Sequence, residues 1–277
     1  MPAAPMLHAH GAAIPAIGFG TSSITAECGP LVAHALKVGY RHIDTAQKYG
    51  TERGVGEGLR ASGISRDEIF LTTKVSHEYL RAADFERSTE GCLSALRVDY
   101  VDLLLVHWPN AAIPLAETMA ALGKMKQRGL TRHVGVANFN LAMLDQAIAM
   151  CPEPIVNLQT EFHPYINPVK VLAGCRQRGV LLTGYCPLGR GQLIDDPVLA
   201  EIGRAYRKTP AQVALRWQLQ HEGAIPLPRS SNLGRIAENF AIFDFTLSAA
   251  EMQRISALKR AGAKIADPTG RAPEWDD

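Results

Sequence analysis

The sequence predicts an α/β fold, a (β/α)8 TIM barrel with an N-terminal β-hairpin cap and extra C-terminal helices. Short runs of apolar and β-branched residues alternate with longer amphipathic stretches, a pattern typical of βαβ units and a parallel sheet. Eight such runs fill the 277 residues, and eight βα units close this barrel. No linker, low-complexity segment or shift in composition divides the chain, so we expect one domain over residues 1–277.

The eight predicted strands are short apolar runs, and Gly or Pro stands at most of the joints between elements. The strands cover residues 16–19, 42–43, 69–73, 101–106, 133–136, 155–158, 180–183 and 224–227. Amphipathic patterns between the strands predict helices. The clearest of these helices cover residues 28–38, 84–96, 115–128, 141–150, 168–178 and 210–220.

Segments outside the eight units predict the additions to the barrel. Residues 7–14 precede the first strand and predict a small hairpin that caps the bottom of the barrel. Residues 232–240 and 248–259 follow the last strand and predict two further helices. The second of these helices begins with a capping-box pattern at Ser248 and Glu251.

Composition and charge disfavour several function classes. The chain has 29 Lys and Arg against 27 Asp and Glu, a balance that argues against a dedicated nucleic-acid or membrane-surface protein. The longest aliphatic run, residues 103–106, is too short to span a bilayer. No Lys or Arg precedes Lys37, so the chain lacks the basic segment with which a signal peptide begins. The five cysteines form no CxxC pair and no zinc-ligand spacing. We therefore expect a cytoplasmic monomer with reduced thiols, no metal, and no nucleic-acid or membrane partner.

Three successive predicted strands end in a titratable residue. Asp44, Lys74 and His107 close the second, third and fourth strands. Tyr49 lies in the loop that follows Asp44. Because a barrel places its chemistry at the carboxyl ends of its strands, these side chains should meet at one mouth. Each residue alone fits an ordinary ion pair, but three in register beside a tyrosine favour a catalytic site.

This combination of residue types can protonate a carbonyl oxygen. A free phenol has a pKa of about 10, and a neighbouring ammonium group lowers that pKa. We expect Lys74 to act on Tyr49 in this way and Asp44 to keep Lys74 charged and oriented. A neutral His107 imidazole can hydrogen-bond the substrate carbonyl and orient it. The four residues therefore predict proton donation to a carbonyl oxygen while hydride arrives at its carbon.

Six segments of the chain resemble the aldo-keto reductase family, in the family's order and over nearly the whole length. They are residues 39–49, 73–74, 102–109, 135–139, 184–189 and 228–239. The resemblance implies that NADPH binds extended across the mouth, that Tyr49 is the general acid, and that there is a catalytic tetrad. That tetrad is Asp44, Tyr49, Lys74 and His107. The ending, residues 270–276, is similar to the bacterial 2,5-diketo-D-gluconate reductase and methylglyoxal reductase branch.

The resemblance also implies a cofactor site. In that site the amides of Asn138 and Gln159 hold the nicotinamide carboxamide, and Tyr185 stacks on the ring. Residues 187–191 form a loop whose backbone covers the pyrophosphate. The full set of implied cofactor residues is Gly20, Thr21, Asp44, Asn138, Gln159, Tyr185, Cys186, Pro187, Leu188, Gly189, Arg229, Ser230, Ser231, Asn232, Arg235, Glu238 and Asn239.

Two cations at the adenosine end of this site favour NADPH over NADH. Residues 229–232 follow the eighth predicted strand and open a short helix, where barrels commonly bind phosphate through helix N–H groups. Arg229 can pair bidentately with a 2′-phosphate, and Arg235 adds a second positive charge on the same helix. A solvated surface pair is the alternative interpretation of these two arginines.

Two departures from the family pattern shape the predicted substrate site. Ser22 and Ser76 stand where many members carry aromatic residues, so the aromatic wall is thinner. Trp108 is expected to line the site, and Trp275 either folds over the mouth or docks on the body. Large hydrophobic aldehydes would bury less surface here. We therefore expect small carbonyl substrates such as dicarbonyls and sugar-derived keto acids.

Two other functions stay open beside the leading one. A Schiff-base aldolase would use Lys74 as its nucleophile, although an adjacent Asp44 would keep that lysine charged. A non-catalytic NADP(H)-binding regulator would be similar to the potassium-channel β subunits, although the intact tetrad argues against it. The leading prediction is an NADPH-dependent aldo-keto reductase that converts aldehydes and ketones to alcohols by hydride transfer.

Overall fold

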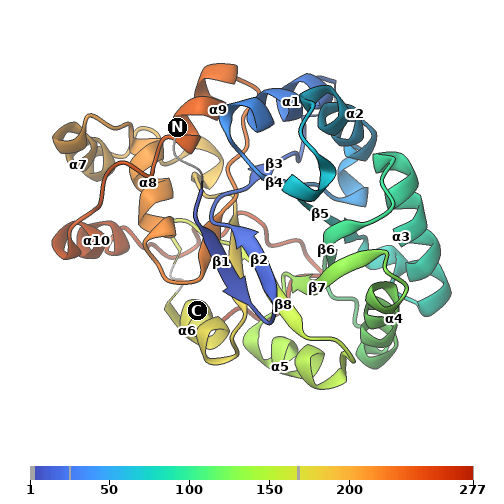
Figure 1. Ribbon diagram of the computed structural model, residues 1–277. Coiled ribbons are helices and arrows are strands. Elements are labelled where there is room, and N and C mark those ends of the chain that lie inside the picture. The colour runs from blue at the N-terminus through green and yellow to red at the C-terminus, as the bar shows by residue number, and fades with distance from the viewer. Residues whose placement is uncertain (1–3, 25, 167–168, 277) are drawn as a thin grey trace.

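The centre of the molecule is an eight-stranded parallel sheet whose strands follow one another in chain order (Figure 1). The computed structural model describes residues 4–24, 26–166 and 169–276. The strands of the sheet are β3 (Phe19–Gly20), β4 (His42–Asp44), β5 (Phe70–Val75), β6 (Val101–Val106), β7 (Thr131–Ala137), β8 (Ile155–Glu161), β9 (Leu181–Tyr185) and β10 (Ala224–Pro226).

Two backbone hydrogen bonds join the first strand of this sheet to the last. Gly18 N donates to Pro226 O at 3.1 Å, and Gly20 N donates to Pro228 O at 3.0 Å. The sheet therefore closes on itself, which confirms the predicted barrel. The first strand begins later than predicted because Ala16 N still bonds to Pro5 O, beside the N-terminal hairpin.

The N-terminal hairpin closes the bottom of the barrel, as predicted. Strands β1 (Met6–Ala9) and β2 (Ala12–Pro15) pair antiparallel through a two-residue turn. Ala12 and Ile14 are fully buried against residues that point into the barrel, such as Leu103. In Figure 1 the hairpin lies across the centre of the ring of strands.

Ten helices of the described chain surround the strands (Figure 1). They are α1 (Cys28–Val38), α2 (Glu52–Ser62), α3 (Ala82–Leu96), α4 (Leu115–Gln127), α5 (Leu141–Met150), α6 (Val169–Gln177), α7 (Pro197–Tyr206), α8 (Pro210–Leu219), α9 (Leu233–Phe240) and α10 (Ala249–Ser256). The helices α1 and α5 have the predicted bounds, whereas α2 and α7 were not predicted. Pro168, where the sequence places the start of α6, lies outside the described residues.

The two extra C-terminal helices are present, and a capping box starts α10 as predicted. Ser248 accepts a hydrogen bond from the Glu251 amide, and the Glu251 side chain accepts one from the Ser248 amide. The helix ends at Ser256, earlier than the predicted residue 259. It ends there because Leu258 N bonds to Ile255 O, a tighter i→i+3 bond that terminates the helical ladder.

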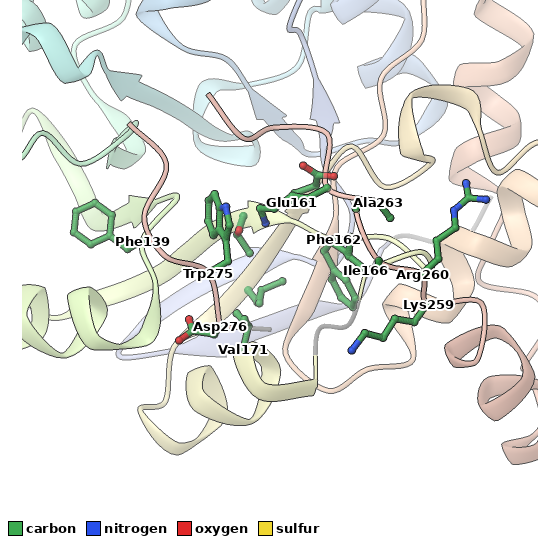
Figure 2. Close-up of a pocket in the computed structure, with 15 residues that line it drawn as sticks. Phe139, Glu161, Phe162, Ile166, Val171, Lys259, Arg260, Ala263, Trp275 and Asp276 are labelled. Atoms are coloured by element: carbon green, nitrogen blue, oxygen red, sulfur yellow. The ribbon is translucent and has the colours of Figure 1, made fainter. Parts of the chain in front are cut away.

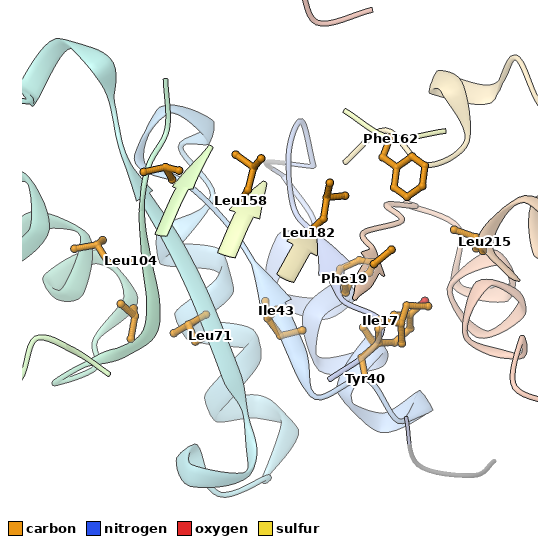
Figure 3. Packing of buried hydrophobic residues seen from close by; sticks show 14 of the residues in the cluster. Ile17, Phe19, Tyr40, Ile43, Leu71, Leu104, Leu158, Phe162, Leu182 and Leu215 are labelled. Carbon is orange, nitrogen blue, oxygen red and sulfur yellow. The ribbon is translucent and has the colours of Figure 1, made fainter. Parts of the chain in front are cut away.

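Alternation along the strands divides the core into two layers. Leu104 of β6 packs outward under the helices with the residues drawn in Figure 3, whereas Leu103 and Leu105 pack inside the barrel. By the same alternation Phe70 and Lys74 of β5 lie on the inner side, Phe70 near the bottom and Lys74 near the mouth. The inner layer is therefore apolar at the bottom and polar at the mouth, the end formed by the carboxyl ends of the strands.

None of the helices in the described part of the chain is long and apolar enough to cross a membrane. The expectation of one domain over residues 1–277 stays a prediction.

Candidate active site

A buried ion pair occupies the middle of the mouth. Lys74 Nζ lies 2.5 Å from Asp44 Oδ1 and also donates to Thr45 O at 2.8 Å. Gln159 Nε2 donates to the other Asp44 oxygen at 2.8 Å. Lys74 and Asp44 are on adjacent strands and are almost fully buried. The carboxylate is therefore held from two sides.

The proton stays on Lys74 in this arrangement. Burial disfavours the ammonium form, but the Asp44 carboxylate, through its charge and its hydrogen bond, and the neighbouring Tyr49 oxygen together outweigh burial, so the pKa of Lys74 lies above its ordinary value. Burial raises the pKa of Asp44, while Lys74 and Gln159 oppose that rise by favouring the carboxylate. Lys74 is therefore a cation whose positive charge faces Tyr49.

Tyr49 lies at the end of the short helix η1 (Gln47–Tyr49), which follows β4. Lys74 Nζ lies 5.0 Å from the centroid of the phenol ring. Lys74 acts on the phenol pKa in the predicted direction, but the net shift is upward. Burial raises the pKa of Tyr49, and the opposing effect of Lys74 is smaller. Tyr49 is thus a neutral phenol, the form that can donate a proton.

His107 follows β6 and faces the phenol edge-on. The ring centroids of Tyr49 and His107 are 5.4 Å apart, with an angle of 83° between the ring planes. Burial and the positive charge of Lys74 lower the pKa of His107 to about 3. The imidazole is therefore neutral near neutral pH and can hydrogen-bond a polar substrate atom. The structure brings all four residues of the predicted tetrad to one place, while their catalytic roles stay predictions.

Gln47 supports the helix that carries Tyr49, and sequence reasoning missed it. Its Oε1 accepts hydrogen bonds from Ser76 N at 3.2 Å and from Ser88 Oγ at 2.8 Å. These bonds tie η1 to the end of β5 and to α3. The only sequence signal for Gln47 was its position two residues before Tyr49.

Asn138 and Tyr185 form a connected set of hydrogen bonds beside the tetrad. Asn138 Nδ2 donates to His107 O at 2.8 Å, and Tyr185 Oη donates to Asn138 Oδ1 at 2.7 Å. Asn138 adopts a left-handed backbone conformation with φ of 62°. The set links the ends of β6, β7 and β9, where the sequence predicts the nicotinamide.

The loop after β9 contains the residues predicted to cover the pyrophosphate. Cys186 and Gly189 have φ angles of 49° and 56°, so the loop turns sharply. Gln218 Nε2 donates to Pro187 O at 2.9 Å and fixes the loop to α8. Leu188 lies between Pro187, which is fixed by this bond, and the turn at Gly189. Burial raises the pKa of the Cys186 thiol, so it is not an activated thiolate.

The start of α9 is where the sequence predicts a phosphate site. Asn232 caps the helix by accepting a hydrogen bond from Arg235 N at 3.0 Å, and Ser230 Oγ accepts one from Asn232 N at 3.0 Å. Ser231 between them is exposed. The side chains of Arg229 and Arg235 are also exposed, and neither forms an ion pair within the described ranges.

Four further residues of the predicted cofactor set lie near these groups. Thr21 follows Gly20 at the end of β3 and donates from Oγ1 to Asp44 O at 3.0 Å. Glu238 and Asn239 belong to α9, where Asn239 is buried. Glu238 Oε1 already accepts a hydrogen bond from Thr209 Oγ1 at 2.8 Å, which fixes its carboxylate.

The C-terminal tail, residues 257–276 of the described chain, contacts a residue that follows β6. Trp275 meets Trp108 edge-on, with ring centroids 6.2 Å apart. Of the two serines predicted in the substrate site, Ser76 is buried and donates from Oγ to a Glu78 oxygen at 3.0 Å, whereas Ser22 is half-buried. The tail therefore places Trp275 on the predicted substrate residue Trp108.

Glu161 anchors this tail, and sequence reasoning missed it because the predicted sixth strand ended at residue 158. Its carboxylate accepts hydrogen bonds from Ile265 N at 2.9 Å, Ala266 N at 2.7 Å and His163 Nε2 at 2.8 Å. Burial alone would raise the pKa of Glu161, but these donors outweigh burial and hold it below its ordinary value. Glu161 is 3% exposed, so the anchor is a buried charge with several donors.

A cavity of about 310 Å³ lies beneath the tail (Figure 2). Phe139, Glu161 and Trp275 are among the labelled residues around it. No residue of the predicted tetrad lines this cavity. Within the described chain, no group of three His, Cys, Asp or Glu side chains is placed to hold a metal ion.

Comparison with known proteins finds the same fold and related sequences. The family model described as "Aldo/keto reductase family" matches residues 16–260. Methylglyoxal reductase DkgB of Escherichia coli O157:H7 is 38% identical over 95% of this chain and 100% of that protein.

Two solved structures show the same relationship in three dimensions. A putative 2,5-diketo-D-gluconic acid reductase B is 44% identical with a TM-score of 0.96, covering 99% of this chain and 98% of that chain. A Bombyx mori aldo-keto reductase in complex with NADP is 32% identical with a TM-score of 0.88, covering 94% of each chain. The similarity therefore extends over nearly the whole chain.

Proposed function

The chain belongs to the aldo/keto reductase family and is an oxidoreductase, and from this premise we propose that it reduces small aldehydes and ketones with NADPH. The observation that carries the proposal is the cluster of a neutral phenol, a neutral imidazole and a buried ammonium–carboxylate pair at the mouth. This cluster contains a proton donor and a group that can orient a carbonyl.

Each residue of the cluster has a separate task in the proposed reaction. Tyr49 donates its phenolic proton to the carbonyl oxygen of the substrate. Lys74 stabilises the phenolate that remains, because its ammonium charge lies 5.0 Å from the centroid of the phenol ring and favours the charged form of Tyr49. Asp44 keeps Lys74 charged and in position. The neutral His107 ring hydrogen-bonds the carbonyl oxygen and holds it beside the phenol.

The residues along the mouth fit NADP(H). Asn138, Gln159 and Tyr185 would hold the nicotinamide, and the turn at Cys186 with the loop after it would hold the pyrophosphate. Arg229 and Arg235 support NADPH over NADH, because both cations are exposed without an ion-pair partner in the described chain. The nicotinamide, when bound, supplies the hydride that adds to the carbonyl carbon.

The proposed substrates are dicarbonyls and sugar-derived keto acids. Ser22 and Ser76 stand where the family resemblance places aromatic residues in many members, which would leave less apolar surface for a large hydrophobic aldehyde. The names of the relatives, methylglyoxal reductase and 2,5-diketo-D-gluconic acid reductase, support the same classes. We also propose that the protein is a monomer and that it is cytoplasmic. The five cysteines, which form no disulfide, support the proposed location.

The geometry gives no support to a Schiff-base aldolase. Such an enzyme needs a neutral lysine amine, whereas Lys74 is paired with Asp44 and has a raised pKa. A non-catalytic regulator would not need a proton donor beside a carbonyl-orienting imidazole.

Steady-state rates with NADPH and NADH test the proposal. Methylglyoxal, 2,5-diketogluconate and a bulky aromatic ketone are supplied in turn, and oxidation of the nicotinamide is followed. We expect higher kcat/KM for the first two substrates and for NADPH. A strong preference for the aromatic ketone would contradict the substrate proposal, and no carbonyl reduction at all would contradict the reaction.

A further inference from the structure

The tail places one arginine beside Trp108, the residue that follows the proposed catalytic histidine. The Arg271 guanidinium carbon lies 6.0 Å from the centroid of the Trp108 ring. Trp108 directly follows His107 and packs edge-on against Trp275. Arg271 therefore lies over the residue that borders the reacting end of the mouth.

The part of the tail that carries Arg271 is held on both sides. Before it, Glu161 binds the amides of Ile265 and Ala266. After it, Asn140 Nδ2 donates to Glu274 O at 2.9 Å. The Asp276 carboxylate accepts a hydrogen bond from Leu141 N, at the start of α5. A turn bond from Arg271 N to residue 268 O at 3.1 Å fixes the backbone between these anchors. The guanidinium is thus positioned by a braced segment.

Two lysines at the mouth are neutralised by carboxylates of the protein, whereas Arg271 is not. Lys74 pairs with Asp44, and Lys48 pairs with Glu78 at 2.9 Å. Arg271 forms no ion pair with any residue in the described ranges. An anionic group of a ligand could therefore pair with the guanidinium and neutralise its charge.

The positive charge of Arg271 acts on two histidines at the mouth. After burial and Lys74, it is among the positive charges that lower the pKa of His107. After burial it also lowers the pKa of His77, which lies in η3 (His77–Tyr79) just beyond β5. The guanidinium therefore acts on the imidazoles that follow β5 and β6, in agreement with its position over Trp108.

We propose that Arg271 selects carbonyl substrates that carry a carboxylate a few bonds away from the reacting carbonyl. This inference rests on the proposed function, because Tyr49 and His107 must fix the carbonyl end. The other end then extends past Trp108, where a guanidinium can bind a carboxylate through two parallel hydrogen bonds. A neutral substrate of the same length forms no such pair.

Matched substrates test this selection. The kcat/KM for 4-oxobutanoate is compared with that for its methyl ester, which has the same aldehyde and no charge. We expect Arg271→Gln to lower the acid-to-ester ratio of kcat/KM about 10- to 100-fold. Arg271→Lys should give a smaller loss, because lysine keeps the charge but lacks the planar fork. Added salt should lower the ratio in the wild type and have little effect in Arg271→Gln.

A control variant removes the same charge far from the mouth. Arg87→Gln on α3 breaks an exposed i,i+3 pair with Asp84 and should leave the acid-to-ester ratio unchanged. Equal losses for acid and ester in Arg271→Gln would show that Arg271 only supports the tail and would overturn the proposal. Unchanged kcat/KM values for both substrates in Arg271→Gln would overturn it as well.

A binding measurement separates this inference from the proposed reaction. Succinate carries carboxylates but no reducible carbonyl, and its binding can be followed by tryptophan fluorescence. We expect succinate to bind at least about tenfold more weakly to Arg271→Gln than to the wild type. If succinate binding depends on Arg271 but no carbonyl is reduced, the proposed function fails and the anion site stands. If carbonyls are reduced while succinate binding ignores Arg271, the anion site alone fails.

Discussion

The mouth of the barrel is built from two regions that hold their side chains in different ways. Asp44 and Lys74 lie inside adjacent strands, are almost fully buried and make several hydrogen bonds. Arg271 and Trp275 lie in the tail, whose described residues form neither helix nor strand after α10. The tail is held on the barrel by separate contacts between loop and strand residues, among them the amides bound by Glu161 and the bond from Asn140 to Glu274.

This difference separates the proposed chemistry from the proposed selectivity. Proton transfer requires groups held close to one productive geometry, which a hydrogen-bonded sheet supplies. Contacts with the far end of a substrate tolerate looser support. Substitutions in the strands and in η1 should therefore change rate and stability, whereas substitutions in the tail should change which substrates react.

Removal of the phenolic hydroxyl should have the largest effect. Tyr49→Phe loses the proposed proton donor while keeping the ring, so kcat with methylglyoxal should fall about 10²- to 10⁴-fold. The rate is measured by oxidation of NADPH. Tyr79→Phe, at an exposed tyrosine of η3, is the matched control and should keep its rate. An unchanged kcat in Tyr49→Phe would remove the phenol from the mechanism.

Removal of the buried ammonium group should mainly reduce stability. Lys74→Met leaves Asp44 buried without a counter-charge and should lower the free energy of unfolding by about 3–5 kcal/mol. Lys48→Met breaks the exposed pair with Glu78 and should cost only about 0–1 kcal/mol. Urea unfolding measures both. Adding Asp44→Asn to Lys74→Met should restore part of the loss, and a loss no larger than that of Lys48→Met would contradict the buried charge.

Loosening the tail should have a smaller effect. Glu161→Gln removes the charge that binds two tail amides and His163, and should lower the free energy of unfolding by about 1–3 kcal/mol. Proteolysis of the tail should also become faster. Glu222→Gln, at an exposed pair with Arg176, is the control and should change neither.

The effect of Glu161 should depend on pH with a definite sign. Its pKa is held below the ordinary value, so its stabilising contribution is complete above the unfolded pKa of about 4.3. The contribution is lost as the pH falls through the lowered folded pKa. The stability difference between the wild type and Glu161→Gln should therefore shrink in acid, and a difference that grows in acid would contradict the anchor.

Glycines explain why the sequence did not predict α2. Three glycines in this helix reduce its helix propensity. A Cβ on Gly56 would lie 2.1 Å from Leu96 O, and one on Gly58 would lie 2.5 Å from Gly29 O. These glycines allow α1, α2 and the end of α3 to pack closely. By contrast, α7 had a local signal in Asp196 and Pro197, an N-cap followed by a first-turn proline, which could have predicted it.

The sequence by itself determined the eight strands, most of the helices and the polar residues that end three of the strands. These features are local, because apolar periodicity and strand-end positions are contained in consecutive residues. Only the tertiary structure decided the raised pKa of Tyr49, because burial outweighs Lys74. It also decided the tail anchor, since Glu161 and Ile265 are 104 residues apart in the chain. Burial and distance between remote residues are properties of the packed molecule, and no local pattern contains them.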